Sequence, residues 1–130
     1  MRVRPPPSPL ILKPQKFMEM EKQIDSLIED FCNEIELPVE ILKITGYHKP
    51  KIYKGIIVSQ VRQSLCYHLV NKYPHLSLTY ICRKIGYKDH STWVKQWKVV
   101  HNYIKTNDKV FSPYWTILQR VASNPKYSHK

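Results

Sequence analysis

The chain has 130 residues, enough for one domain, and 42% of them are hydrophobic, enough to fill a packed core. Its three glycines lie too far apart to build the glycine-rich loops of P-loop or dinucleotide-binding enzymes, so enzymes of those kinds are excluded. The three cysteines, Cys32, Cys66 and Cys82, include no CxxC pair. Their number and spacing disfavour a disulfide framework or a zinc site and are typical of reduced thiols in a cytosolic protein.

Charge divides the chain into two unequal parts. The formal net charge is +11, and residues 1–40 hold five basic and eight acidic residues, whereas residues 41–130 hold sixteen basic and two acidic residues. These positive charges repel one another unless an anionic partner neutralises them. Nucleic acid is the first candidate, because binding of basic side chains to its phosphates releases counterions and is favourable. The alternative is a solvated, highly charged surface. We expect a cytoplasmic, nucleoid-associated protein with no membrane partner, because no apolar run approaches the roughly 18 residues of a membrane span.

The hydrophobic pattern predicts an all-α fold of five or six helices behind a disordered, proline-rich tail at residues 1–16. Apolar residues recur at helical spacing, and prolines, glycines and capping residues separate one period from the next. In chain order, the predicted helices cover residues 17–36, 38–45, 58–72, 77–86, 89–106 and 113–122. A basic loop is expected at residues 46–57, no segment predicts a strand, and residues 124–130 are expected to form a flexible basic tail, which leaves 17–123 as the domain.

The fourth and fifth predicted helices are separated by a short turn that contains Gly86. Ser77 and Asp89 are suited to cap the starts of these helices, and Gly86 is suited to end the first of them. Two helices joined in this way, within the basic part of the chain, indicate a helix-turn-helix. The first turn of the second helix carries short hydrogen-bonding side chains suited to base edges, which are Asp89, His90, Ser91 and Thr92.

Two tryptophans follow this turn at a spacing of four residues. Trp93 and Trp97 are expected on the buried face of the helix, together with Val100 and Ile104. The alternative is an exposed platform on which bases stack, which would suit single strands.

The stretch SLTYICRKIGYKDHSTWVKQWKVV, residues 77–100, resembles the signature of the C-terminal DNA-binding domain of the bacterial replication initiator DnaA. That pattern is SLPEIG followed, after a few residues, by GRDHTTV. Upstream, VRQSLCYHLV at 61–70 resembles the family's helix that begins with RQ, and residues 24–43 resemble its first two helices. The resemblance covers about residues 24–120 and implies a Trp-repressor-like helix-turn-helix that binds double-stranded DNA.

The resemblance also implies a role for individual residues. The Arg of the RQ pair enters the minor groove in that family, which points to Arg62, although on its own this residue reads as a solvated arginine at a helix start. The family's DHTT residues read the major groove, which points to Asp89, His90 and Ser91, with Thr92 assisting. We expect contacts to the DNA backbone from basic residues around these sites, namely Lys49, Lys51, Lys54, Lys84, Lys88 and Lys95.

The chain departs from the family pattern in ways that bear on its target. Ser91 stands where the family has Thr, so a methyl group suited to a thymine methyl is lost. Trp93 replaces the Val after DHTT, and SLPEIG becomes Ser-Leu-Thr-Tyr-Ile-Cys. The ATPase domain through which DnaA assembles is not part of these 130 residues. We therefore expect a stand-alone, monomeric regulator of replication or transcription, of phage or mobile-element type, with a preferred sequence different from the initiator's own box.

A second hypothesis is an adaptor that binds nucleic acid without sequence preference. Its acidic helix at 17–36, or the proline-rich tail, would dock a protein partner. Catalysis is not expected, because Asp89, His90 and Ser91 are adjacent on one helical turn and point in different directions. No cofactor or metal is expected either, because the histidines lack the spacing of metal ligands.

Overall fold

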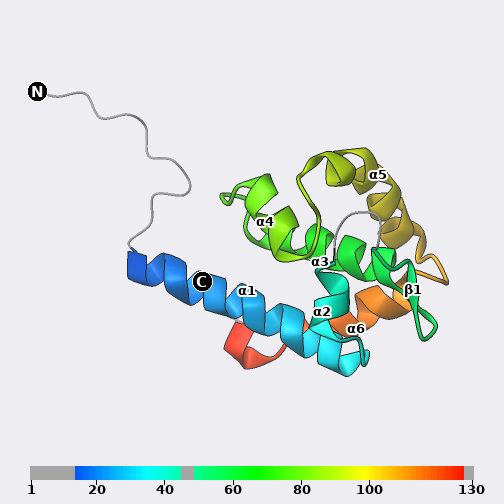
Figure 1. The fold of residues 1–130 in the computed structure, drawn as a ribbon, viewed down its shortest axis with the longest axis horizontal. Coiled ribbons are helices and arrows are strands. Elements are labelled where there is room, and N and C mark those ends of the chain that lie inside the picture. Colours follow the sequence, from blue (N-terminus) through cyan, green and yellow to red (C-terminus); the bar gives the residue numbers. More distant parts are fainter. Residues whose placement is uncertain (1–13, 45–48, 128–130) are drawn as a thin grey trace, which may run out of the picture.

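The computed structural model describes residues 14–44 and 49–127, and the predicted all-α architecture is confirmed in this part of the chain. Helices pack around one core, with a very short β-hairpin at its side (Figure 1). In chain order the elements are α1 (Pro14–Glu34), α2 (Val39–Leu42), β1 (Ile52–Tyr53), β2 (Ile56–Ile57), α3 (Val58–Lys72), α4 (Leu78–Lys84), α5 (Ser91–Thr106), α6 (Ser112–Ala122) and the 3-10 helix η2 (Pro125–Tyr127). None of the helices in these ranges is both long and apolar enough to cross a bilayer.

Helix α1 begins earlier than the sequence predicts. Most of the predicted tail, residues 1–13, lies outside the described residues, but Pro14 to Lys16 belong to the first turn of α1. Proline is well suited to that position, because the first N–H groups of a helix have no intrahelical acceptor and its φ is already close to the helical value.

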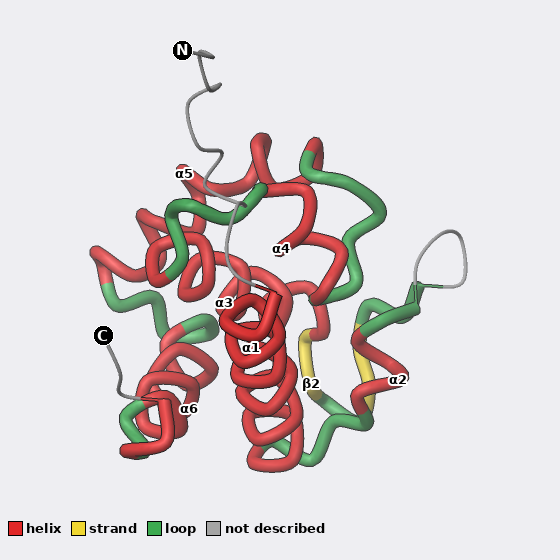
Figure 2. The backbone as a smooth tube through the Cα atoms, turned by 90° about the vertical axis from the view of Figure 1, so that its left-hand side faces the viewer, coloured by secondary structure: helices red, strands yellow, loops and turns green. Residues whose placement is uncertain are grey.

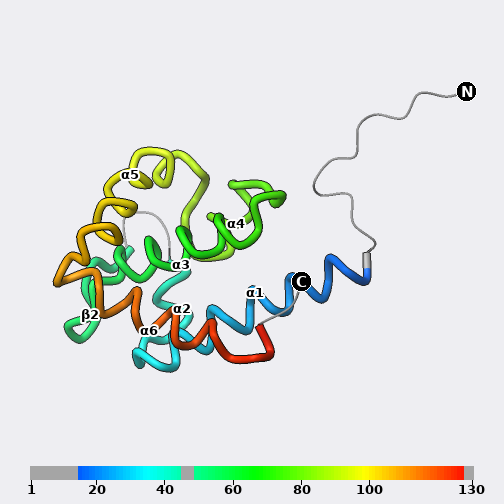
Figure 3. Tube along the Cα trace, turned by 180° about the vertical axis from the view of Figure 1, so that it is seen from behind, coloured from blue at the N-terminus to red at the C-terminus, as the bar shows by residue number. Residues whose placement is uncertain are grey.

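Helix α3 is the centre of the fold and contacts α2, α4, α5 and α6. Its predicted apolar stripe of Val61, Leu65 and Leu69 is completely buried. On the other side, α1 and α6 run side by side, as the view from behind shows (Figure 3). The core therefore lies between α3 and the α1–α6 pair, and α4 and α5 pack on α3 from outside.

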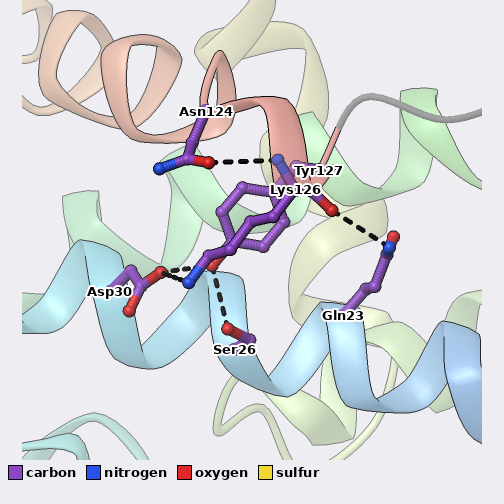
Figure 4. Close-up of polar contacts among 6 residues, drawn as sticks. All are labelled: Gln23, Ser26, Asp30, Asn124, Lys126 and Tyr127. Atoms are coloured by element: carbon purple, nitrogen blue, oxygen red, sulfur yellow. Dashed lines mark hydrogen bonds and ion pairs between the residues drawn. The ribbon is translucent and has the colours of Figure 1, made fainter.

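The C-terminal residues are attached to α1, so the predicted flexible tail is wrong for residues 124–127. The ring of Tyr127 is buried, and its hydroxyl donates a hydrogen bond to Asp30 and lies 3.0 Å from the hydroxyl of Ser26 (Figure 4). The ammonium of Lys126 lies 2.9 Å from the same Asp30 carboxylate. These contacts join the two ends of the domain through a turn whose polar residues gave no periodic signal.

The predicted loop at 46–57 contains a two-stranded hairpin, which corrects the expectation that the chain has no strand (Figure 2). Lys54 and Gly55 form its turn with φ values of 48° and 84°. Two consecutive residues with positive φ are typical of the type I′ turn, which matches the twist of paired strands. The backbone N–H of Ile57 donates to the hydroxyl of Tyr114 at 2.9 Å, which holds the hairpin on α6.

The turn that leads into α6 is held by Asp108, a residue that the sequence analysis did not single out. Ser112, the residue before the predicted start at 113 and so the expected cap, is the first residue of the helix itself. The carboxylate of Asp108 instead accepts hydrogen bonds from the backbone N–H groups of Val110 and Phe111, at 3.1 and 3.0 Å. An acidic side chain here closes the turn before the helix and lies near its N-terminus, where negative charge is favourable.

Candidate nucleic-acid interface

Helices α4 and α5 form the predicted helix-turn-helix arrangement, with residues 85–90 between them (Figure 1). Ser77 caps α4 as expected, because its hydroxyl accepts a hydrogen bond from the backbone N–H of Tyr80 at 3.3 Å. At the other end, Gly86 has φ +98° and the N–H of Tyr87 donates to the carbonyl of Cys82 at 2.9 Å. This bond pattern with a left-handed glycine is a Schellman motif, so the predicted end of α4 is confirmed.

Gly86 also lies against the end of α2. A Cβ atom added at Gly86 would lie 2.1 Å from the carbonyl oxygen of Leu42 and 3.1 Å from Nε of Arg62. No other residue type fits this approach without moving backbone. The turn of the helix-turn-helix is therefore fixed to α2 as well as to α4 and α5.

The first turn of α5 is organised by Asp89. Its Oδ1 atom accepts from the backbone N–H of Ser91 at 2.9 Å and from the hydroxyl of Ser91 at 2.5 Å. These bonds hold the pKa of the Asp89 carboxyl below its usual range, the Ser91 hydroxyl having the largest effect. Asp89 thus bonds the first N–H group of α5, but the N-cap position itself belongs to His90, so the predicted cap is wrong by one residue. Oδ2 of Asp89 accepts no hydrogen bond from the described residues.

The structure places all four predicted base-reading residues of the turn next to one another. His90 and Ser91 are exposed, and Asp89 and Thr92 are half-buried. The ring of His90 is held by α4, because its Nδ1 lies 3.0 Å from the hydroxyl of Thr79. Hydrogen-bonding groups thus gather at the N-terminus of a 16-residue helix, where backbone N–H groups also favour an anionic ligand.

Exposed cations border this turn. Lys88 and Lys95 are exposed on either side of it, and Arg83, which the sequence analysis did not single out, donates from Nε to the carbonyl of Lys88 at 3.3 Å. Lys49 reaches the turn from the preceding loop, with its ammonium 5.3 Å from the centre of the Tyr87 ring. Burial, and then the nearby charge of Arg62, lower the pKa of Lys49.

The two remaining lysines of the hairpin region are exposed. Lys51 precedes β1, and Lys54 lies at the hairpin turn with its ammonium 5.5 Å from the centre of the Tyr53 ring. Their exposure leaves the predicted contact to a DNA backbone sterically possible.

Lys84 is not free in this way, and its predicted contact to the DNA backbone does not fit the structure. Its ammonium lies 2.7 Å from a carboxylate oxygen of Asp25 and 3.2 Å from one of Glu21, and its side chain is 18% exposed. Helix α1 packs beside α4 at this point, so the positive charge of Lys84 is used to hold two carboxylates of α1.

Arg62 departs most from its predicted role. The residue is 1% exposed, so it is neither a solvated residue at a helix start nor placed to enter a minor groove in this conformation. Its Nε donates to the carbonyl of Leu42 at 2.9 Å, and Nη2 donates to that of Ile44 at 3.2 Å. The carbonyls at the end of a helix lack intrahelical partners and carry partial negative charge, which is what a guanidinium binds. Burial lowers the pKa of Arg62.

The two tryptophans of α5 have different environments. Trp93 is buried as predicted, but Trp97 is 43% exposed, which corrects its placement in the core. The inward face of α5 continues from Trp93 through the half-buried Gln96 to Val100, and Trp97 lies about 40° around the helix from Trp93, on the side away from Gln96. Trp97 borders a groove of about 280 Å³ that Val94 and Trp93 also line.

The described residues contain no group of three or more His, Cys, Asp or Glu side chains placed to hold a metal. Cys66 and Cys82 are buried free thiols whose sulfur atoms lie 3.9 Å apart between α3 and α4.

Comparison with known proteins gives no match to a family model, to a curated protein or to a solved structure.

Proposed function

We propose that the chain binds double-stranded DNA sequence-specifically through its α4–α5 helix-turn-helix and acts in replication or transcription regulation. The observation that carries the proposal is the N-terminal turn of α5, where Asp89, His90 and Ser91 present hydrogen-bonding groups between the exposed Lys88 and Lys95. The resemblance of residues 77–100 to the DnaA signature supports the same assignment.

In the proposed complex, the first turn of α5 enters the major groove. Oδ2 of Asp89 would accept a hydrogen bond from a cytosine or adenine amino group, and the outer ring nitrogen of His90 would bond a neighbouring base. Lys88 and Lys95 would bind flanking phosphates and set the position of the helix, as would Lys51 on the hairpin side.

Arg62 contributes to this function from inside the protein. Because its guanidinium bonds α2 and lies beside Gly86, it holds the helix-turn-helix in place rather than reading DNA itself. The proposal therefore differs from the DnaA family's pattern at this residue.

The alternative of a non-specific adaptor that docks a partner through acidic α1 receives less support. Most of the acidic residues in the second and later turns of α1 bind cations of the same chain. These ion pairs are Lys84 with Glu21 and Asp25, Lys126 with Asp30, and Arg120 with Glu34. A partner would have to compete with them for the carboxylates.

Selection from a random duplex library tests the proposal. The enriched duplex, a scrambled duplex, its single strands and a duplex with a DnaA-type box would then be compared by fluorescence anisotropy at two salt concentrations. We expect a preference of about 10³ or more for the enriched duplex over the scrambled one near physiological salt. A selection that enriches no sequence, or equal affinities with equal salt slopes, would refute sequence-specific binding. Tighter binding to single strands would favour a role for exposed Trp97 as a stacking platform.

A further inference from the structure

The side chain of Thr79 connects the two helices of the helix-turn-helix at the surface. Thr79 lies in the first turn of α4, and its Oγ1 is 3.0 Å from Nδ1 of His90, eleven residues later in the chain. Thr79 itself is half-buried, and His90 is exposed. Neither periodicity nor the DnaA resemblance gives Thr79 a role, since the family's SLPEIG has a proline there, without a hydroxyl.

We propose that Thr79 is a specificity-determining positioning residue that fixes the tautomer and ring orientation of His90; this rests on the DNA-binding function proposed above. A neutral imidazole has one protonated nitrogen and one acceptor nitrogen, and the hydrogen bond at one of them decides the state of the other. In the proposed arrangement the Thr79 hydroxyl, which can donate or accept, donates and Nδ1 accepts. The proton of neutral His90 would then be on Nε2, which has no hydrogen-bond partner among the described residues and is a donor.

The remaining groups of the turn complete the pattern. The hydroxyl of Ser91 and the Oδ1 atom of Asp89 are bonded to each other, so neither offers its full capacity to DNA. The groups without a partner among the described residues are then a donor at Nε2 of His90 and an acceptor at Oδ2 of Asp89. In the major groove, a donor fits the N7 of a purine, and an acceptor fits the amino group of cytosine or adenine. The turn therefore selects a site in which such groups are neighbours.

Two matched variants separate the hydroxyl from the shape of the side chain. Thr79→Val keeps the β-branched shape and removes the hydroxyl, whereas Thr79→Ser keeps the hydroxyl. Nitrogen-15 NMR of the free protein, at a pH where imidazole is neutral, reports the tautomer of His90, with its signals assigned by their loss in His90→Ala. We expect Nε2–H in the wild type and in Thr79→Ser, and a mixture of tautomers in Thr79→Val. Thr79→Ala repeats the measurement without a β-branched residue in the helix should Thr79→Val not fold.

DNA binding gives the second readout. Thr79→Val should lose about three- to tenfold in affinity for the selected duplex, the range of one hydrogen bond, with no change for a scrambled duplex. Replacing purines of the selected duplex one at a time by 7-deaza analogues, which lack N7, should weaken wild-type binding at one position. The same replacement should have no effect on His90→Ala.

Three results would overturn the inference: an unchanged tautomer in Thr79→Val, an unchanged preference between duplexes, or equal losses on both duplexes. If the wild type prefers no duplex at all, the proposed function fails. The NMR measurement still decides separately whether Thr79 sets the state of His90.

Discussion

Gly86 offers the sharpest test of how the helix-turn-helix is fixed, because the chain contains a second glycine with nearly the same backbone conformation. Gly86 has φ +98° and Gly55 has φ +84°. An alanine at either position pays the strain of a left-handed conformation, about 1–2 kcal/mol. Only at Gly86 would the new methyl group meet another part of the fold.

The additional penalty at Gly86 follows from the contact with α2. The added Cβ would lie 2.1 Å from the carbonyl oxygen of Leu42, while nothing lies within 4 Å of a Cβ at Gly55. The turn must move away from α2 by more than about 1 Å to reach ordinary contact, which disturbs the bond from Arg62 to the same carbonyl. Weakening a buried charged hydrogen bond costs a further 1–3 kcal/mol or so, giving about 2–5 kcal/mol for Gly86→Ala.

Thermal unfolding followed by circular dichroism measures the difference. For a chain of this size, 1 kcal/mol corresponds to roughly 4 °C, so Gly86→Ala should lower Tm by about 8–20 °C and Gly55→Ala by about 4–8 °C. Equal losses in the two variants would refute the close approach of the turn to α2, because backbone strain alone would then account for both.

Further predictions concern buried charge, DNA contacts and pH. Arg62→Lys keeps the charge but cannot bond several carbonyls at once, so urea unfolding should show a loss of about 1–3 kcal/mol, and wild-type stability would refute the buried role. His90→Ala should cost about 1–3 kcal/mol of binding free energy on the selected duplex and less on scrambled DNA, and equal losses on both would refute base reading. Lys51→Ala should weaken binding to both duplexes alike and flatten the salt slope by about one unit in anisotropy titrations. The hydroxyl of Tyr127, and then Lys126, hold the pKa of Asp30 below its usual value. This stabilisation is present above the unfolded pKa of about 3.9 and is lost as pH falls through the folded value, so Tyr127→Phe should show a shallower loss of Tm below about pH 4, and a parallel decline would contradict the linkage.

Much of the fold could be predicted because it depends on local signals. The bounds of α3, the Ser77 cap and the Gly86 turn follow from residues next to one another in the chain. The hairpin was missed because each strand has two residues, too few for an alternating pattern, and its Lys54-Gly55 turn lacks the usual Asn or Asp. Its stability comes from Tyr114 on α6, a contact between distant residues.

The candidate site was predictable only where its residues act locally. Asp89, His90 and Ser91 follow from the start of a helix, but the bond of His90 to Thr79 depends on how α4 and α5 cross. The burial of Arg62 likewise depends on α2, because the carbonyl of Leu42 at the end of α2, twenty residues earlier in the chain, meets the guanidinium. Helical spacing placed Trp97 on the buried face because residues four apart lie on the same side of a helix. The stripe of α5 that contacts α3 is narrower than this rule assumes, and Trp97 lies outside it.

The net charge of the basic segment overstates what remains for DNA. Arg62, Lys84, Arg120 and Lys126 are bonded to carbonyls or carboxylates of the same chain, and removing them from those partners would cost stability. The exposed lysines near the turn and hairpin have no such partner among the described residues and lose only water when they meet phosphate. The slope of log affinity against log salt concentration should therefore correspond to this smaller set of cations. A slope so steep that every basic residue of 41–130 had to contact phosphate would mean that the ion pairs of α1 open on binding.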